Sequence, residues 1–597
     1  MAVDLLTTSG INSLINSYKL TESSRLITPI NTRKTKYQSL STAYSNLSSK
    51  LDALKSLLNE LKTSGSGSAF SSKSATSSNT NFLTATASSL AGLGSYDLRI
   101  SQLAKSDIAM SHELTSSAIS ALDGVHSFMI KTGDGSTGEY TSTIEVEFDS
   151  SDPTQTNKSV MEKIRDAINS DKAIVKSNTF SASAAYTGGP GTLKLNLNGT
   201  ETEISYNGGG TYEDLIDELV TNISANTSGV VAEKVVDSPN PGDVSLKLTV
   251  SDSSKYISIS HSTGADIVSD LNIGVTKEKG ASGIVTAASF SPDATTSQFS
   301  LTSKSTGLDF RIKELTDLNG GSALSFLGLN LGSSRPEFTQ SADLTDTPGF
   351  MYSDITAGGN LLNSRINFNG LDIQRNSNTI NDLVTGVTFT LKSVMQPTDT
   401  TVNVAIQNNV PSIKTKIEEF VAKFNDVYSY IKTNSTTSKD ERGVFVGDSS
   451  ATSILNSFAS TAYTPVSGIL QGSLNTLSQL GITFNSSTGL VISDSALLEQ
   501  KLTESISQVE AVFNSTNGVA SKLFSIVSPY TGSTGYLANS ISSLSTNIQG
   551  LDDKLTSVQN RINKTAESLR AQYQRLQLQL ASLLDLSGSF SDTNSFF

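Results

Sequence analysis

The sequence contains no cysteine and no tryptophan among its 597 residues. Without cysteine the protein has no disulfide, no thiol nucleophile, no iron–sulfur cluster and no cysteine-ligated zinc. Only 17% of the residues are charged and 36% are hydrophobic. This composition favours exposed β-structure and long helices with polar faces over a compact cytosolic enzyme. A chain of this length is also expected to form several domains.

Histidine is scarce as well. The three histidines, His112, His126 and His261, lie far apart, and none has a partner at a spacing typical of metal ligands. A run of three glycines before Thr211 resembles a phosphate-binding loop only in its glycines, because no Lys-Ser/Thr ending follows. Thr211 as a helix N-cap, with Asp214 three residues later, explains that stretch locally. We therefore predict no catalytic residue, no cofactor and no metal, and expect the protein not to be an enzyme.

Long hydrophobic runs are also absent. No window approaches the roughly 18 apolar residues needed to cross a bilayer, so we predict no membrane insertion. The amino terminus lacks the basic and apolar regions of a Sec signal peptide, so secretion would use another route. The net charge is −13, and residues 107–345 carry 16 Lys and Arg against 31 Asp and Glu. Because such an acidic block repels polyanions, we predict no nucleic-acid binding.

A regular hydrophobic pattern begins at Leu26. Apolar residues recur at steps of three and four over about five heptads, which predicts a helix with a coiled-coil seam. Thr28 and Pro29 suit its start, as a capping hydroxyl and a first-turn proline. The alternating serines and glycines at 64–68 suit its end. The seam residues that we predict for an assembly interface are Leu26, Ile30, Leu40, Leu47, Leu51, Leu54 and Leu58.

The same spacing returns near the carboxyl end. It runs from Leu537 to Leu583 with one stutter near Thr565. The flanking positions are mostly uncharged, so interhelical charge pairs do little to select one partner. The seam fits two arrangements: contact with other subunits, or an intramolecular hairpin of the two terminal helices. The residues predicted here for the assembly interface are Leu551, Leu555, Val558, Ile562, Leu569, Tyr573, Leu576 and Leu580.

Between the two helical ends the pattern changes to alternation. Residues 95–103 and 386–394 alternate as strands, and residues 413–431 return to helical spacing. In the acidic middle, two segments repeat one order of strands, a short helix and more strands. In each repeat a strand-like segment follows the short helix: the segment from Ile174 in the first repeat and the segment from Val230 in the second. The end of the first repeat appears only after the whole second repeat, which predicts one module inserted into a loop of a related module.

Motifs at both ends of the chain are more specific than these patterns. The opening stretch, Thr8-Ser-Gly-Ile-Asn-Ser-Leu, precedes the helix with Pro29, and two strand-like stretches occur at 81–88 and 94–105. Later come Leu480-Gly-Ile-Thr-Phe-Asn-Ser-Ser-Thr-Gly-Leu and the shorter stretches 518–523, 530–535 and 572–576. In order and spacing these stretches resemble the flagellar hook-associated protein 2 family, the filament cap proteins also called FliD. The Gly-Leu-Asp that usually follows the opening motif in that family is absent.

The resemblance implies an α+β multidomain fold. Terminal coiled-coil helices form a leg, a mixed α/β region forms a stalk, and the two related modules, one inserted in the other, form a β-rich head. The expected parts are the leg at 1–62 and 537–597, the stalk at 65–106 and 346–536, the first head module at 107–185 and 282–345, and the inserted second head module at 186–281.

The resemblance also implies a function and partners. Members of the family form a secreted homo-oligomer, commonly a pentameric ring, at the filament tip, where it promotes folding and insertion of exported flagellin subunits. The implied partners are flagellin, the hook–filament junction proteins and an export chaperone at the C-terminal helix, with export through the flagellar type III apparatus. Two alternatives stand beside this hypothesis: another axial subunit (flagellin or a junction protein), and an adhesin with an acidic head exposed at the tip.

Overall fold

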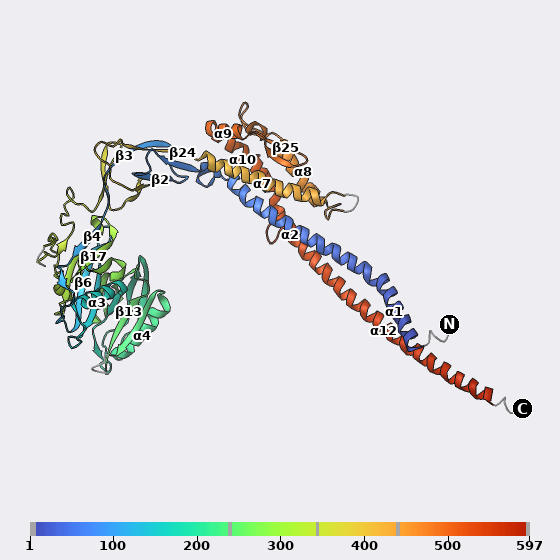
Figure 1. The fold of residues 1–597 in the computed structure, drawn as a ribbon, viewed down its shortest axis with the longest axis horizontal. Coiled ribbons are helices and arrows are strands. Elements are labelled where there is room, and N and C mark those ends of the chain that lie inside the picture. Colours follow the sequence, from blue (N-terminus) through green and yellow to red (C-terminus); the bar gives the residue numbers. More distant parts are fainter. Residues whose placement is uncertain (1–6, 237–241, 342–344, 438–441, 593–597) are drawn as a thin grey trace. The chain divides into compact units, whose positions relative to one another are not determined.

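The computed structural model describes residues 7–236, 242–341, 345–437 and 442–592. These residues form two compact units. Unit 1 contains the described residues of 1–74, 88–90 and 407–597, and unit 2 contains those of 75–87 and 91–406. Figure 1 follows the chain from the first helices through the strands and back to the last helix. Unit 1 therefore consists mainly of the two ends of the chain, and unit 2 of its middle.

Unit 1 is mostly helical. No helix in the described part of the chain is both long and apolar enough to cross a membrane. The elements of unit 1 are α1 (Thr8–Glu22), a π-helical turn (Ser23–Ile27), α2 (Thr28–Lys62), α7 (Val410–Asn434), α8 (Ser449–Tyr463), β25 (Ile482–Asn485), β26 (Gly489–Ile492), α9 (Ser495–Glu504), α10 (Ile506–Asn514), α11 (Val519–Val527) and α12 (Tyr536–Asp592). The helix predicted at 413–431 is confirmed as α7, and the long carboxyl-terminal helix as α12.

The core of unit 1 joins the second half of α2 to helices from residues 407–536. Leu54 and Leu58 of α2 lie in one hydrophobic cluster with Phe420 and Phe424 of α7 and Leu523 of α11. The prediction of a single stalk from 65–106 and 346–536 is therefore wrong, because most of its second piece shares a core with the amino-terminal helix. A leucine seam shows that one helix face is buried, but it does not specify which distant segment buries it.

Unit 2 begins and ends with two small antiparallel sheets. The strands predicted at 95–103 and 386–394 are confirmed as β3 and β23, and they pack their apolar sides into a common core that includes Leu98, Ile100 and Phe389. One sheet has the order β1 (Lys73–Ser77), β24 (Val402–Asn408), β3 (Gly94–Gln102), β20 (Ser364–Phe368) and β21 (Leu371–Arg375), and the other has the order β2 (Leu83–Ala87), β23 (Val387–Leu391) and β22 (Thr379–Val384).

The rest of unit 2 confirms two related head modules, one inserted in the other. Each has its own hydrophobic core. The first contains β4 (Ser106–Met110), β5 (Leu114–Thr115), β6 (Gly124–Gly133), β7 (Glu139–Phe148), α3 (Asn157–Ser170), β16 (Val285–Phe290), β17 (Thr296–Thr306), β18 (Ile312–Leu318), α6 (Ala323–Leu327) and β19 (Gly349–Phe350). The second contains β8 (Ile174–Lys176), β9 (Phe180–Ser181), β10 (Gly191–Leu197), β11 (Thr200–Tyr206), α4 (Tyr212–Asn226), β12 (Val230–Val236), β13 (Asp243–Val250), β14 (Tyr256–Gly264), α5 (Ile267–Asp270) and β15 (Val275–Lys279).

The strand pairings of the two modules correspond. In the first module β6 pairs with β7 and β18, and β17 pairs with β16, β4 and β5. In the second module β10 pairs with β11 and β14, and β13 pairs with β12, β8 and β9. A parallel bridge between Glu278 of β15 and Thr141 of β7 joins the two modules into one seven-stranded sheet.

These pairings correct the predicted module boundaries 107–185, 186–281 and 282–345. The strand from Ile174 belongs to the second module, where Val175 pairs with Leu248. The strand from Ile174, β8, corresponds to β4 of the first module. The strand of the second module that follows its helix, β12, corresponds to β16 of the first module, which comes after the insertion. The first module also extends beyond 345, because Phe350 lies in its core. The insertion begins directly after α3, so the next strand in sequence belongs to a different module.

Candidate functional site: the paired terminal helices

The two terminal helices lie antiparallel to each other in unit 1. Lys34 of α2 forms an ion pair with Asp552 of α12, and the guanidinium of Arg570 donates a hydrogen bond to the side-chain oxygen of Asn12 at 3.0 Å. Residue numbers therefore rise along one helix as they fall along the other, and Figure 1 shows α2 and α12 side by side. Of the two arrangements that fit the seam, this chain therefore forms the intramolecular hairpin of its two terminal helices.

The amino-terminal helix starts earlier than predicted. The Thr7 hydroxyl caps it by accepting a hydrogen bond from the Gly10 amide at 3.1 Å, and the chain stays helical through the π-helical turn into α2. Thr28 has helical backbone angles inside this continuous run, so its predicted capping role is wrong. In a regular α-helix the ring of Pro29 would clash with the carbonyl four residues earlier, but the π-helical turn at Ser23–Ile27 interrupts the regular spacing directly before it.

Contacts between α1 and α12 extend the hairpin beyond α2. Ile11 and Ile15 are 2% exposed and pack with Ala566 of α12, which is 1% exposed. Leu569 and Tyr573 of α12 are half-buried against this cluster. α1 thus covers the part of α12 around residues 566–573. The sequence pattern missed α1 because only two of its residues, Ile11 and Ile15, are buried.

A polar contact joins the middle of α2 to the start of α8. The Tyr44 hydroxyl of α2 donates a hydrogen bond to the carboxylate of Asp448 at 2.6 Å. Burial, together with this carboxylate, raises the pKa of the Tyr44 phenol well above its ordinary value. The same Asp448 caps α8 by accepting from the Ser450 and Ala451 amides. α2 is therefore held to α8 by a part-buried hydrogen bond as well as by its leucines.

The predicted interface residues fall into three groups. The first group fills the core of the chain itself and is not available to another subunit: Leu47, Leu51, Leu54 and Leu58, all at most 1% exposed. The second group lies along the helix pair and is buried or half-buried there: Leu26, Ile30, Leu40, Leu551, Leu555, Val558, Ile562, Leu569 and Tyr573. The third group, Leu576 and Leu580, is exposed at 43% and 37%.

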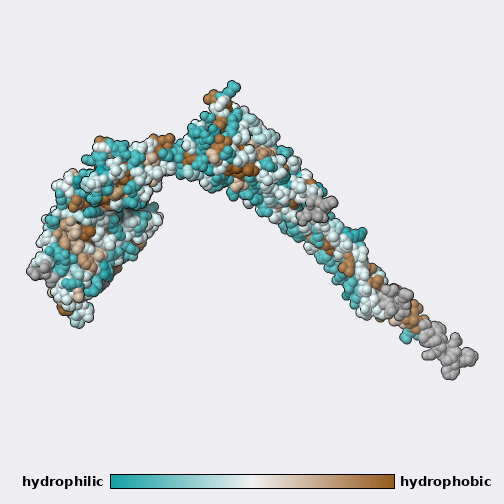
Figure 2. Space-filling view, turned by 45° about the horizontal axis from the view of Figure 1, so that its top comes forward, coloured by the Kyte–Doolittle hydropathy of each residue, from teal (hydrophilic) through white to brown (hydrophobic). Residues whose placement is uncertain are grey.

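The exposed group is part of a larger leucine-rich surface, here called the terminal leucine surface. It adds four leucines to Leu576 and Leu580, with exposed fractions of 56% to 72% for Leu578, Leu583, Leu584 and Leu586. Figure 2 shows brown, hydrophobic residues on these turns of α12, next to the grey end of the chain. Leu578, Leu584 and Leu586 were not among the predicted residues because they lie off the seam; the density of leucine over 576–586 is the signal that marks them.

The residues considered for other chemistry have ordinary structural roles. His126 accepts from the Ser322 amide at 2.9 Å, His261 lies 3.6 Å from Asp266, and burial lowers the pKa of His112. Thr211 and Asp214 form the predicted cap of α4. Over the described ranges, no three His, Cys, Asp or Glu side chains form a group that could hold a metal ion.

Comparison with known families decides the assignment. The model of the flagellar hook-associated protein 2 amino terminus matches residues 9–107, and that of its carboxyl terminus matches residues 362–584. Together they cover more than half of the chain, in the expected order. The chain belongs to the flagellar hook-associated protein 2 family. The matches include α1, α2 and nearly all of α12, and they leave the two head modules outside.

Curated members of the hook-associated protein 2 family align at low identity. The A-type protein of Pseudomonas aeruginosa is 24% identical over 302 residues, which is 46% of this chain and 62% of that protein. The protein of Salmonella typhimurium is 26% identical over 40% of this chain and 53% of that protein. The chain therefore spans about half to two thirds of these two relatives. A crystal structure of the D1-D2-D3 domains of the flagellar cap protein FliD from Escherichia coli is 19% identical, with a TM-score of 0.47, covering 84% of this chain and 99% of that chain.

Proposed function

We propose that the chain caps the flagellar filament as a non-enzymatic homo-oligomer. The observation that carries this proposal is the terminal leucine surface on a chain of the hook-associated protein 2 family. In the part of the chain that the structure describes, α12 is covered by α1 and α2 only as far as about Tyr573. Six exposed leucines over 576–586 form an apolar surface of the kind that marks a protein–protein contact.

The spacing of these leucines favours more than one neighbour. At about 100° per residue, Leu576, Leu580, Leu583 and Leu584 fall within about 100° of the helix circumference. Leu578 and Leu586 lie outside that stripe. A single helix packed along the stripe would leave these two exposed, whereas a bundle of helices from several subunits would cover both sides. This arrangement supports an assembly with several copies, for which the family resemblance suggests a pentameric ring.

The cap hypothesis includes partners and a location. The protein would leave the cell through the flagellar type III apparatus and act outside the cell at the filament tip. There it would hold exported flagellin subunits while they fold and insert, and it would contact the hook–filament junction proteins before filament growth begins. Before export, a chaperone would cover the terminal leucine surface, since an exposed apolar patch promotes aggregation.

Two measurements test this function. Purified full-length protein should form rings or stacked plates in negative-stain images, whereas fibres would favour flagellin and isolated rods an adhesin. In a strain that lacks its own cap protein, expression of this chain should restore filaments and retain flagellin on the cell. If the protein reaches the medium but neither filaments nor flagellin retention is restored, the proposed function is contradicted.

A further inference from the structure

A small cavity in the first head module has an unusual lining for this acidic region. The cavity has a volume of about 280 Å³ and lies between the start of β18, the segment around Ser333 and Ser334, and the residues after β19. Arg311, Lys313 and Arg335 line it together with one wall formed by Phe350, and no acidic residue does. The surrounding stretch, 107–345, has about twice as many acidic as basic residues. Three cations around one cavity therefore stand out from their surroundings.

Arg335 is the most firmly held of the three cations that line the cavity. Its guanidinium pairs with the fully buried carboxylate of Asp107 and donates to the Tyr352 and Ile312 carbonyls at 2.8 Å and 3.2 Å. It also lies over the Phe350 ring at 3.9 Å. Arg335 is therefore held rigidly, and Asp107 balances its charge.

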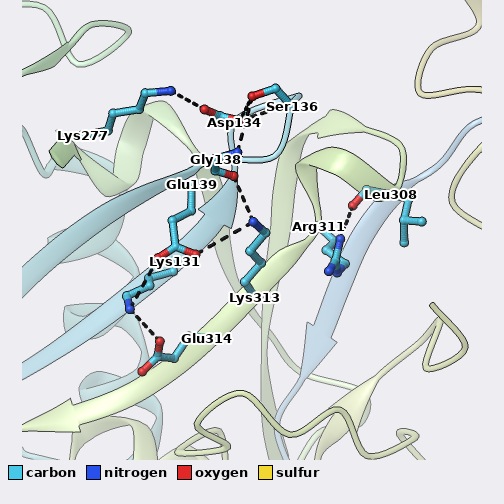
Figure 3. A network of polar contacts seen from close by, with 10 residues as sticks. All are labelled: Lys131, Asp134, Ser136, Gly138, Glu139, Lys277, Leu308, Arg311, Lys313 and Glu314. Carbon is cyan, nitrogen blue, oxygen red and sulfur yellow. Dashed lines mark hydrogen bonds and ion pairs between the residues drawn. The ribbon is translucent and has the colours of Figure 1, made fainter. Parts of the chain in front are cut away.

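Lys313 is only partly balanced. Its ammonium donates to the Gly138 carbonyl at 2.9 Å and lies 3.9 Å from the Glu139 carboxylate. Glu139 is shared with Lys131, whose other partner is Glu314 at 2.8 Å. Figure 3 shows this chain of contacts across the strands. Because Coulomb attraction falls with distance, this long ion pair to a shared carboxylate neutralises the Lys313 charge only in part.

Arg311 has no carboxylate partner among the residues that the structure describes. Its guanidinium donates a hydrogen bond to the Leu308 carbonyl at 2.9 Å, which Figure 3 shows. The nearest acidic residue in sequence, Asp309, accepts a hydrogen bond from the Asn376 amide at 2.7 Å instead. Arg311 is half-buried and lines the cavity, so its charge is available to a ligand there.

We propose that this cavity binds a small oxyanion: a carboxylate, sulfate or phosphate group, free or attached to a sugar. The Arg311 guanidinium would hold two of its oxygens in a forked pair of hydrogen bonds. Lys313 would add charge, the hydroxyls of Ser333 and Ser334 would contact a third oxygen, and Phe350 would pack against the carbon part of the ligand. The volume suits a ligand no larger than a monosaccharide, being at the lower end for small-molecule sites.

The test is calorimetric titration of the full chain at constant ionic strength, with chloride as the background anion and sulfate, inorganic phosphate or glucuronate as the probe. Binding of at least one probe is expected. Arg311→Gln should weaken it by about tenfold or more, because a hydrogen bond to a charged group is lost. Arg165→Gln is the matched control, since that arginine pairs with its neighbour Asp166 on α3 and lies outside the cavity. Preference for glucuronate would identify an acidic sugar, and equal binding of the inorganic ions would identify a free anion site.

Arg311→Lys separates a folding defect from loss of the site. It keeps the charge but loses the fork, so its affinity should lie between those of the wild type and Arg311→Gln, with an unchanged melting temperature. The proposal is overturned if no probe binds above the chloride background, or if Arg311→Gln and Arg165→Gln bind the probes as the wild type does.

Discussion

Replacement of Leu54 by alanine separates the stability of the chain from its assembly. Leu54 is 0% exposed and lies in the core that α2 shares with α7 and α11. Leu54→Ala removes buried carbon atoms from a packed core, so it should lower the free energy of unfolding of unit 1 by about 2–5 kcal/mol. Leu580 was predicted for the same assembly interface, on the carboxyl-terminal helix, but is 37% exposed. Leu580→Ala should therefore change the free energy of unfolding by less than about 0.5 kcal/mol.

Urea unfolding followed by far-UV circular dichroism measures both effects. Because the chain has two compact units, the curve should be fitted with two transitions. With a urea dependence of about 2 kcal/mol per molar, a loss of about 3 kcal/mol lowers the midpoint of the unit 1 transition by about 1.5 M. If Leu54→Ala leaves both midpoints unchanged but prevents oligomer formation, Leu54 faces another subunit and the assignment of the α2 core is refuted.

Three further predictions concern the head and the helix pair. Burial raises the pKa of Glu278 to about 8 from an ordinary 4.5, so its contribution to stability is lost as the pH rises from about 4.5 to 8. The wild type should therefore lose melting temperature relative to Glu278→Gln as the pH rises over this range. A difference in melting temperature that stays constant with pH would contradict the raised pKa of Glu278. Asp107→Ala should destabilise the head by about 3–5 kcal/mol in urea unfolding because it leaves the buried charge of Arg335 without its carboxylate, whereas Asp166→Ala, at an exposed carboxylate, should cost at most about 1 kcal/mol. Leu569→Asp puts a carboxylate into the contact with α1 and should abolish filament capping while the head stays folded by circular dichroism; normal filaments would argue against it.

Local patterns predicted the terminal helices and the insertion of one head module in another. The spacing of Leu47, Leu51 and Leu54 marked a buried helix face, and the cap formed by Thr211 and Asp214 was correct in detail. These features depend on neighbours within one or two turns, which the sequence displays directly.

The partners of these elements were not predictable in the same way. The leucines of α2 gave no sign that α7 and α11 cover them, since a seam records burial and not the identity of the covering segment. Ile174 was assigned to the wrong module because strand pairing joins residues far apart in sequence. The cation-lined cavity also escaped prediction, since Arg311 and Arg335 meet only after β18 and the following loop have folded.

The central claim is that the terminal leucine surface assembles the cap. Its most direct test is a variant with Leu576, Leu580, Leu583 and Leu584 all changed to serine, expressed in a strain without its own cap protein. The variant should keep the melting profile of the wild type and reach the medium, yet electron microscopy should show no filaments, and flagellin monomers should accumulate outside the cell. Full-length filaments in cells that export this variant would contradict the claim.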